Sequence, residues 1–489
     1  MRVMIVSAEM VPFAKVGGLA DVVGSLPAAL RRAGVDARVI MPGYGFISHE
    51  KHQISRLFSF DFNHRKGVSQ VDVYTCVEDG VPIYLVQSWP YFGNDTSVYT
   101  DWNWDVPRFI FFNQIAMAVA WQLQDRLGWF PDVFNVSDWH TSLLPFLLDE
   151  SHHKPEWSQV AAVTTIHNIA YQGAGVGGFM WDIGIPPRTH SLLEKHDLTD
   201  NLLATAIAYS DMINTVSPTY AEEIKYPHAG YELAPIINDR SPDLRGILNG
   251  IDTDLWNPAT DPHLISNYSE TSFADQRIAN KRHIQSVARL PLREDVPVIG
   301  VVSRLTWQKG FDMAVPALRA LMEDTDAQLI LLGTGDSEIE AALRQLTYDF
   351  SDKVRAFIEF DAVLAQQIYG GCDMFLMPSH FEPCGIGQMV AMRYGALPIV
   401  RKTGGLADTV TNYDSADGDV GTGFVFEWET AEAVEGTLSW AIDTYYNRPK
   451  AWRKMQRRAM QTDFSWTKSA EEYIDLYQTA IQKRKDLTR

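Results

Sequence analysis

The stretch Lys15-Val-Gly-Gly-Leu-Ala-Asp21 returns near the other end of the chain as Lys402-Thr-Gly-Gly-Leu-Ala-Asp408. A Gly-Gly turn that opens a helix lets a ligand approach the backbone and points free amides at an anion. The glycines could simply open a helix tightly in each place, but the lysine and the aspartate recur with them. Because no short repeat accompanies this pair, a solenoid is excluded. The echo predicts two similar lobes that face a shared cleft.

Both loops belong to series of short apolar runs that alternate with helix-length segments. Such runs predict parallel strands covered by helices on both faces. The expected fold class is therefore α/β, with two doubly wound Rossmann-like domains. The runs cover residues 3–6, 37–41, 83–86, 133–136, 162–166 and 212–216 in the first half of the chain, and 298–303, 328–332, 356–359, 374–377 and 397–400 in the second.

A crossing between the two domains is expected where turn-forming residues concentrate. Residues 247–261 are rich in Asn, Gly, Pro and Asp, which favour an exposed connection. We therefore expect one domain over residues 1–255 and a second over 256–465. Apolar residues at helical spacing between 473 and 481 predict a one-sided helix within residues 466–489, which should pack back on the first domain.

The composition is that of an acidic globular protein. Of 489 residues, 46% are hydrophobic, and 42 basic against 61 acidic side chains give a formal net charge of −19. This charge disfavours nucleic acid and anionic membranes as partners, whereas a neutral polysaccharide meets no repulsion. The three cysteines show no disulfide or zinc spacing, and the chain shows no signal-peptide pattern and no membrane-spanning run. These features predict a cytoplasmic protein.

Two motifs of the second domain carry charges suited to a phosphate-bearing ligand. Arg304 and Lys309 follow the first strand of that domain, where two cations on a loop can clamp a diphosphate without metal. Taken alone, they could be ordinary surface cations. Glu382 lies in Pro378-Ser-His-Phe-Glu-Pro-Cys-Gly385, between a strand and a helix, where a carboxylate can bind a hydroxyl beside phosphate-binding amides. Cys384 has no visible general base and is interpreted as a small packing residue.

In the first domain, polar residues follow two successive strands. Asp138 and His140 follow one of them, and His167 and Asn168 follow the next. Polar side chains at strand ends that face a cleft suit sugar hydroxyls. The histidines lack zinc spacing, so no metal is expected. No P-loop motif is present, and Gly333-Thr-Gly335 lacks the third glycine of a dinucleotide fingerprint, which leaves an NAD-dependent enzyme as a distant alternative.

Together these motifs resemble the bacterial glycogen synthase and plant starch synthase family, which are retaining, ADP-glucose-using glucosyltransferases of the GT-B fold. The resemblance covers almost the whole chain and keeps the motifs in order. It is carried by Ser7-Ala-Glu-Met-Val-Pro12, the Lys15 loop, Asp138-Trp-His140, Thr165-Ile-His-Asn168, Tyr171-Gln-Gly173, Thr215-Val-Ser-Pro-Thr-Tyr220, Ile247-Leu-Asn-Gly-Ile-Asp252, Ser303-Arg304, Gln308-Lys-Gly310, Pro378 to Gly385, the Lys402 loop and Phe464-Ser-Trp466.

The resemblance implies a role for each matching position. Arg304 and Lys309 would neutralise the departing ADP, Glu382 would bind the donor glucose, and His167 and Asp138 would face the transferring sugar and the acceptor. No cofactor is implied. The remaining substrate-binding positions would border the donor and acceptor sites: Lys15, Gly17, Gly18, Asp21, Asn168, Phe360, Cys384, Gly385, Thr403, Gly404 and Gly405.

At two places near the expected donor site, this sequence differs from the usual family pattern. Phe360 stands where the family often has a tyrosine that stacks on adenine, so the ring is kept and the hydroxyl is lost. Ile386-Gly-Gln388 replaces the usual Leu-Thr-Gln, which removes a hydroxyl near the expected phosphate.

The expected reaction is transfer of glucose from ADP-glucose to the non-reducing 4-hydroxyl of an α-1,4-glucan. Retention of configuration could use a carboxylate nucleophile or attack on the face from which ADP departs. Alternatives are a related hexosyltransferase that uses UDP-glucose or an acceptor such as glucose 1-phosphate, and an inactive glycan-binding scaffold.

Overall fold

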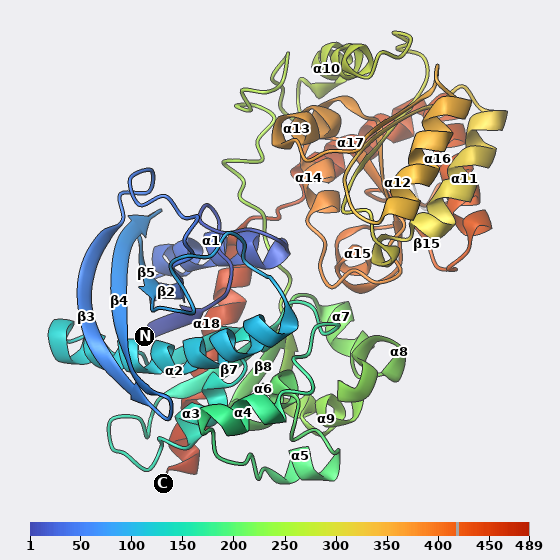
Figure 1. The fold of residues 1–489 in the computed structure, drawn as a ribbon. Helices are drawn as coiled ribbons and strands as arrows, with labels where there is room; N and C mark the ends of the chain where they lie inside the picture. Colours follow the sequence, from blue (N-terminus) through green and yellow to red (C-terminus); the bar gives the residue numbers. More distant parts are fainter. Residues whose placement is uncertain (417–419, 489) are drawn as a thin grey trace. The chain divides into compact units, whose positions relative to one another are not determined.

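The computed structural model describes residues 1–416 and 420–488, which form two compact units, each built around its own sheet (Figure 1). Unit 1 contains Met1–Gly250 and the chain from Trp466 onward, and unit 2 contains Ile251–Ser465. Across the described ranges, no helix combines the length and the apolar content that a membrane crossing needs.

The sheet of unit 1 has nine strands among the described residues, in the order β3-β4-β5-β2-β1-β6-β7-β8-β9. All neighbours pair in parallel except β3 with β4 and β4 with β5. The strand order reverses between β1 and β6, which is the place where open α/β sheets bind ligands. The strands are β1 (Arg2–Val6), β2 (Asp36–Pro42), β3 (Ser55–His64), β4 (Gly67–Glu78), β5 (Val81–Gln87), β6 (Val133–Ser137), β7 (Ala161–Ile166), β8 (Met212–Thr215) and β9 (Leu244–Gly246).

The antiparallel edge of this sheet was not expected from the apolar runs. Hydrophobic and polar residues alternate along β3, which is the pattern of a strand with one solvated face, and its phenylalanines are half-buried. The β3 residues Phe58 and Phe62 face helix α2 (Trp102–Leu127), where Phe58 lies under Arg126 and Phe62 lies 5.9 Å from Phe111 between ring centroids. The hairpin therefore extends the sheet over α2.

The helices of unit 1 pack on the parallel part of its sheet or on one another. They are α1 (Gly18–Arg32), α2, α3 (Leu144–Asp149), α4 (Gly177–Ile183), α5 (Ser191–Lys195), α6 (Leu202–Tyr209), α7 (Pro218–Glu223), α8 (Pro227–Gly230), α9 (Ala234–Asp239) and α18 (Trp466–Leu487), with short 3-10 turns at Trp139–Thr141, Tyr231–Leu233 and Ser241–Asp243. Helix α18, the last along the chain, packs against α1 and strands β6 to β8 (Figure 1).

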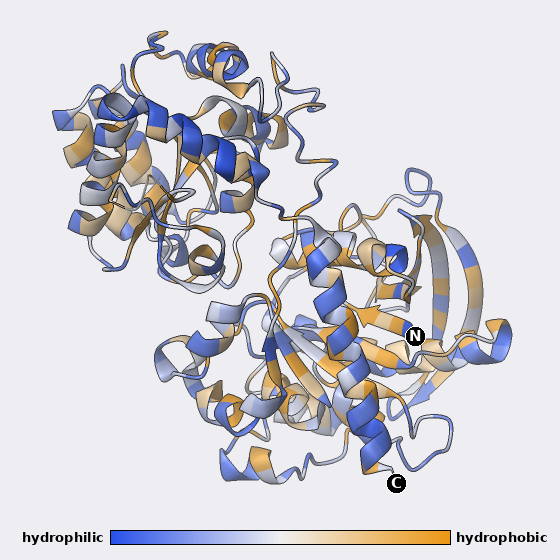
Figure 2. Ribbon diagram, turned by 180° about the vertical axis from the view of Figure 1, so that it is seen from behind, coloured by the Kyte–Doolittle hydropathy of each residue, from blue (hydrophilic) through white to orange (hydrophobic). Residues whose placement is uncertain are grey.

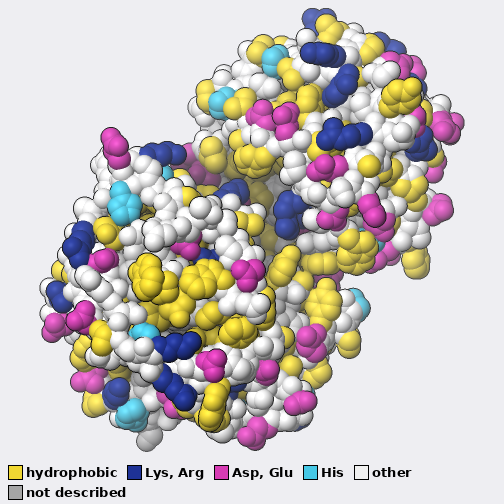
Figure 3. Space-filling model, viewed as in Figure 1, with side chains coloured by type: hydrophobic (Ala, Val, Ile, Leu, Met, Phe, Trp, Pro, Cys, Tyr) yellow, Lys and Arg dark blue, Asp and Glu magenta, His cyan; other side chains and the backbone are white. Residues whose placement is uncertain are grey.

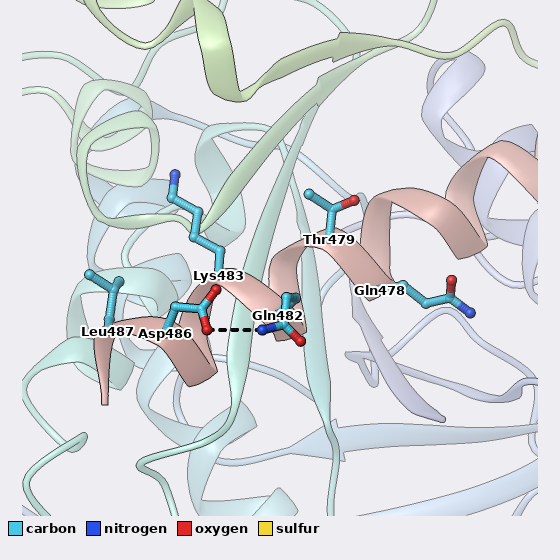
Figure 4. A pocket seen from close by; sticks show the side chains of 6 residues that line it. All are labelled: Gln478, Thr479, Gln482, Lys483, Asp486 and Leu487. Atoms are coloured by element: carbon cyan, nitrogen blue, oxygen red, sulfur yellow. Dashed lines mark hydrogen bonds between the residues drawn. The ribbon is translucent and has the colours of Figure 1, made fainter. Parts of the chain in front are cut away.

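The inner face of α18 carries two fully buried tyrosines. The hydroxyls of Tyr473 and Tyr477 accept hydrogen bonds from Asn214 and Asn135, each at 3.0 Å. The outer face is polar (Figure 2). An open pocket on this helix is lined by Gln478, Thr479, Gln482, Lys483, Asp486 and Leu487, and Gln482 donates to Asp486 there at 2.9 Å (Figure 4). None of these residues is a candidate site residue.

Unit 2 is a doubly wound domain with a parallel sheet of six strands in its described part, ordered β12-β11-β10-β13-β14-β15. The order reverses between β10 and β13. β12 begins two residues before the apolar run expected at 356–359. The strands are β10 (Val298–Val302), β11 (Gln328–Leu332), β12 (Val354–Phe357), β13 (Met374–Met377), β14 (Leu397–Arg401) and β15 (Phe424–Phe426).

The helices of unit 2 enclose this sheet in the order expected of βα units (Figure 1). They are α10 (Phe273–Val287), α11 (Phe311–Asp324), α12 (Ser337–Asp349), α13 (Ala362–Gly371), α14 (Gly387–Arg393), α15 (Gly404–Thr409), α16 (Ala431–Asn447) and α17 (Pro449–Gln461), with a 3-10 turn at Trp307–Lys309.

The chain enters unit 2 after Gly250 and leaves it before Trp466. The amide of Ile251 donates to the carbonyl of Phe464 at 2.8 Å, so the two passages lie side by side at this point. Beyond it, the buried carboxylate of Asp261 accepts a hydrogen bond from Tyr394 at 2.6 Å, which fixes the connecting segment to unit 2.

Candidate functional site

Three loops of unit 2 meet at the C-terminal edge of the sheet, beside the reversal of strand order. They follow β10, β13 and β14 and comprise residues 303–310, 378–385 and 402–405. A Cβ at Gly310 (φ 73°) would lie 2.0 Å from the carbonyl oxygen of Pro378, and the amide of Gly405 donates to the carbonyl of Glu382 at 3.1 Å. Close backbone packing therefore holds the three loops together.

A buried ion pair joins two of these loops. Nζ of Lys309 donates to Oε2 of Glu382 at 2.6 Å, and the hydroxyl of Ser379 donates to the same oxygen at 3.0 Å. The side chains of Lys309 and Glu382 are only 16% and 7% exposed. In such a dry environment, charges act on a bound ligand more strongly than in water. The cation and the carboxylate predicted from separate motifs thus form one cluster.

The loop that carries Glu382 is anchored through His380. Its two ring nitrogens lie 2.8 Å from Asp312 and 3.2 Å from Glu429, and the ring stacks on Trp307 with a centroid distance of 4.3 Å. The amide of His380 donates to the carbonyl of Gln308 at 2.9 Å. These contacts tie the Glu382 loop to the segment that carries Lys309.

The glycines of the Lys402 loop are required by packing within unit 2. A Cβ at Gly404 (φ 43°) would lie 2.0 Å from the carbonyl oxygen of Glu382, and one at Gly405 would lie 2.1 Å from that of Cys384. Thr403 is 2% exposed and precedes α15. This loop therefore supports the backbone around Glu382, Cys384 and Gly385.

Gly385 and Cys384 form the turn into α14. Gly385 has φ 74°, a left-handed conformation suited to glycine, and the side-chain amide of Gln388 donates to the carbonyls of Cys384 and Gly385 at 3.0 and 3.1 Å. The Cys384 side chain is buried, in agreement with its interpretation as a packing residue.

Arg304 and Phe360 are exposed side chains at strand ends of the same edge. Arg304 follows β10, and Phe360 follows β12, two strands away in the sheet order. Phe360 is 87% exposed, while the neighbouring Asp361 caps helix α13 through the amide of Leu364 at 2.9 Å. An exposed ring beside a fixed helix start offers a face for stacking.

The echoed loop of unit 1 differs from that of unit 2. A Cβ added at Gly17 or Gly18 would meet nothing within 4 Å. The ammonium of Lys15 forms an exposed ion pair with Asp21 at 2.7 Å. Internal packing therefore does not require glycine at these two positions. Space is left beside them for a ligand, although the amide of Gly17 donates to Glu9 at 2.9 Å.

Asp138 and His167 come together at the ends of β6 and β7. Oδ1 of Asp138 accepts hydrogen bonds from the amides of His167 and Asn168 at 2.7 and 3.2 Å. Burial raises the pKa of Asp138 to about 7, although these two bonds oppose the shift. Desolvation lowers the pKa of His167 to about 3, so its imidazole is neutral at pH 7. The pair can exchange hydrogen bonds with sugar hydroxyls.

His140 and Asn168 are tied into the protein. His140 is buried, and its ring packs against Tyr99, Phe109 and Trp139 at centroid distances between 4.3 and 4.9 Å. The side-chain oxygen of Asn168 accepts from the amide of Ala170 at 3.1 Å and stabilises the local turn. Both residues thus shape the strand ends around Asp138.

An exposed aromatic surface adjoins this part of unit 1. Trp89 and Trp102 are 77% and 43% exposed, and Trp102 lies 5.6 Å from Trp139 between ring centroids. Tyr91 and Trp104 are also 5.6 Å apart. Hydrophobic side chains gather on the face of unit 1 that carries α2 (Figure 3). An exposed apolar patch of this kind marks an interaction surface.

Three residues of the site were missed by the sequence interpretation. Ser379 and Glu9 lie within motifs that were recognised, but no role was given to either. Glu9 is an acidic residue three positions after a buried strand and shortly before a glycine loop, a signal that could have identified it. Tyr99 contacts Glu9 across 90 residues and has no local signal. In the part of the chain that is described, no three His, Cys, Asp or Glu side chains cluster as metal ligands would.

Comparison with known proteins supports the family suggested by the motifs. The family profile of the starch synthase catalytic domain matches residues 2–239, and that of glycosyl transferases group 1 matches residues 284–459. The chain is 42% identical to a glycogen synthase of Streptococcus equi subsp. equi over 489 residues, which covers 98% of this chain and all of that protein. A glycogen synthase of Streptococcus sanguinis is 41% identical with the same coverage.

Solved structures give the same result. The catalytic domain of starch synthase IV from Arabidopsis thaliana, bound to ADP and acarbose, has a TM-score of 0.89 and 31% identity and covers 98% of this chain and 99% of its own. Sucrose-phosphate synthase from Thermosynechococcus elongatus, at 16% identity and a TM-score of 0.61, shares the fold. The expected α/β class with two doubly wound domains and the expected glycosyltransferase activity are confirmed. The chain belongs to the glycogen and starch synthase family of GT-B glycosyltransferases.

Proposed function

We propose that the protein elongates an α-1,4-glucan by transferring glucose from ADP-glucose to the non-reducing 4-hydroxyl, with retention of the α configuration. The observation that carries this proposal is the buried cluster of Lys309, Ser379 and Glu382 at the reversal of strand order in unit 2. ADP as the nucleotide is supported by the starch synthase IV neighbour, whose structure contains ADP and acarbose.

The leaving group determines the role of the cations. Departure of ADP develops negative charge on its diphosphate, so a cation placed there stabilises the transition state more than the ground state. Lys309 and Arg304 supply this charge. The ion pair with Glu382 holds the Lys309 ammonium in place. Little reorganisation of the protein is therefore needed when charge develops on the diphosphate. Glu382 retains acceptor capacity for the glucose hydroxyls, and the exposed ring of Phe360 stacks on adenine.

The other predicted residues serve the sugar and the phosphate. Lys15, released from Asp21, and Gly17 and Gly18, which have free space beside them, approach the donor. Neutral His167 and the Asp138 carboxyl bind the transferring glucose and the acceptor hydroxyl. Thr403, Gly404 and Gly405 border the donor through the backbone of residues 382–385, with Cys384 and Gly385, and Asn168 holds the turn beside His167.

The acceptor proposal is supported by the surface of unit 1. A glucan is neutral and meets no repulsion from a chain with a net charge of −19. The exposed Trp102, which lies against Trp139 next to Asp138, offers broad apolar contact to a polymer. We propose the cytoplasm as the compartment, in keeping with three free, buried cysteines.

Product analysis tests the proposal directly. The protein is incubated with ADP-glucose or UDP-glucose together with maltooligosaccharides, and chain length, anomeric configuration and nucleotide release are measured. We expect maltooligosaccharides longer by single α-1,4-linked residues, with ADP released faster than UDP. Faster turnover of UDP-glucose would assign a different donor. Glycogen retention without any nucleotide release would instead indicate a glycan-binding scaffold.

A further inference from the structure

A buried carboxylate three residues after β1 has no role in the chemistry proposed above. Glu9 is 4% exposed, and its Oε2 accepts hydrogen bonds from the amides of Val16 at 2.6 Å and Gly17 at 2.9 Å. These two amides belong to the Lys15 loop. The carboxylate therefore occupies donors that would otherwise be open to an anionic ligand at the start of α1.

The other oxygen of Glu9 is bound from a distant segment. The hydroxyl of Tyr99 donates to Oε1 at 2.6 Å, and the Tyr99 ring stacks on His140 with a centroid distance of 4.9 Å. Burial, followed by the charge of Glu9, raises the pKa of Tyr99 well above its usual value, so the hydroxyl stays a donor. Three segments of unit 1 thus meet at one carboxylate.

The segment that carries Tyr99 is itself fixed. Arg108 on α2 is fully buried and donates to Asp95 at 2.8 Å, to Asp105 at 2.6 Å and to the carbonyl of Val98 at 2.6 Å. These bonds hold the chain on both sides of Tyr99. Burying the carboxylate of Glu9 is costly unless all its bonds are made, so its surroundings must keep their geometry.

We propose that Glu9 is a positioning residue for glucosyl transfer. It holds the Lys15–Gly18 loop in the conformation that the donor binds and, through Tyr99, ties that loop to the turn that carries Asp138 and His140. The inference rests on the proposed function, because it assigns the loop to the donor. A loop held in its binding conformation loses less conformational freedom when the donor binds.

Four variants separate this role from a merely structural one. Glu9→Ala removes the carboxylate, and Tyr99→Phe removes one of its donors. Glu9→Gln keeps the shape, since the amide oxygen can accept from both backbone amides while its NH2 group donates to Tyr99. Tyr477→Phe is the matched control, because it also removes one hydrogen bond from a buried tyrosine of unit 1, here with Asn135.

We expect Glu9→Ala and Tyr99→Phe to raise the KM for ADP-glucose by on the order of tenfold, the effect of one or two lost hydrogen bonds, with the KM for maltooligosaccharide changed by less than about twofold. Glu9→Gln should stay within about threefold of wild type. Tyr477→Phe should lower only the melting temperature. Equal changes in both KM values, or a donor KM unaffected by Glu9→Ala, would overturn the proposal.

Hydrogen exchange gives a readout that does not depend on transfer. The amides of Val16 and Gly17 should be protected in the wild type and should exchange faster in Glu9→Ala and Tyr99→Phe, but not in Tyr477→Phe. If wild-type protein transfers no glucose, the proposed function fails while this measurement still tests the positioning of the loop. Unchanged exchange at these two amides in Glu9→Ala would refute the role of Glu9.

Discussion

Asp138 combines two unfavourable features at a single residue. Its backbone has φ 54° and ψ −173°, a region otherwise reserved for glycine, and its carboxyl is buried with a pKa raised to about 7. Such strain persists only where surrounding contacts enforce it, and here the amides of His167 and Asn168 hold the carboxyl in place. This cost in stability agrees with a role in binding or catalysis.

The pKa of Asp138 gives a prediction for stability against pH. The unfolded chain releases this proton near pH 3.8, whereas the folded protein keeps it until about pH 7. The folded state therefore binds more protons between these values, and its stability falls as the pH rises through that window. Asp138→Asn removes this loss, so its free energy of unfolding should exceed that of wild type by an amount that grows from pH 4 to 7, up to about 4 kcal/mol.

Denaturant unfolding at a series of pH values measures this difference, and transfer activity should fall in the same variant. Asp197→Asn is the control, because Asp197 is exposed and also has a positive φ, of 55°. A stability difference that stays constant from pH 4 to 7 would show that relief of backbone strain, and not the carboxyl proton, explains the effect.

Variants of the Lys309–Glu382 pair should affect activity and stability differently. Lys309→Ala should lower kcat/KM by about 10²–10³-fold, because the leaving diphosphate loses a fixed charge. It should also destabilise unit 2 by about 3 kcal/mol, because Glu382 stays buried without its cation. Adding Glu382→Ala should restore stability but not activity. Steady-state kinetics and thermal melting measure the two effects. The control is Lys454→Ala, at an exposed position on α17. Recovery of activity together with stability in the double variant would contradict the assignment.

At the scale of helices and strands, sequence patterns predicted the features that depend on residues close together in the chain. The parallel strands were found because apolar runs such as 298–302 and 328–332 are continuous and buried on both faces. The β3–β4 hairpin was missed, since only continuous runs were sought and Phe58, Phe60 and Phe62 alternate with polar residues. Lys309 and Glu382 were identified from their places after strands, whereas the bond from Tyr99 to Glu9 depends on a fold that brings distant segments together.

The two echoed glycine loops give a prediction at the same scale. A methyl group at Gly18 meets nothing within 4 Å, whereas one at Gly405 would lie 2.1 Å from the carbonyl oxygen of Cys384. Gly18→Ala should therefore leave the melting temperature within about 2 °C of wild type and raise the donor KM. Gly405→Ala should lower the melting temperature by about 4–8 °C, from about 2 kcal/mol of strain. Equal effects of the two variants on melting would show that the loops are equivalent.

At the scale of the whole molecule, chain order and spatial order differ. Helix α18 follows unit 2 in sequence but packs on the sheet of unit 1, so unit 1 is completed only after unit 2 has been made. Each unit has its own sheet and its own buried core. A defect in the attachment of α18 should therefore weaken unit 1 and leave the core of unit 2 intact.

Arg484 provides the test of this independence. Its guanidinium lies 2.7 Å from Asp211, and the two side chains are 9% and 1% exposed. Oδ2 of Asp211 accepts from the amide of Ala162 at 2.8 Å, so the pair fixes α18 to β7. Arg484→Ala leaves a buried carboxyl without its cation, which should cost about 3–5 kcal/mol.

Hydrogen exchange followed by mass spectrometry should show faster exchange in β6, β7 and β8 of Arg484→Ala and unchanged protection in β10 to β14. Lys485→Ala, an exposed position next along the same helix, should change neither set. Because the strand ends of β6 and β7 carry Asp138 and His167, the Arg484 variant should also lose transfer activity at temperatures where unit 2 remains folded. Faster exchange in β10 to β14 as well would mean that the two units unfold as one cooperative body.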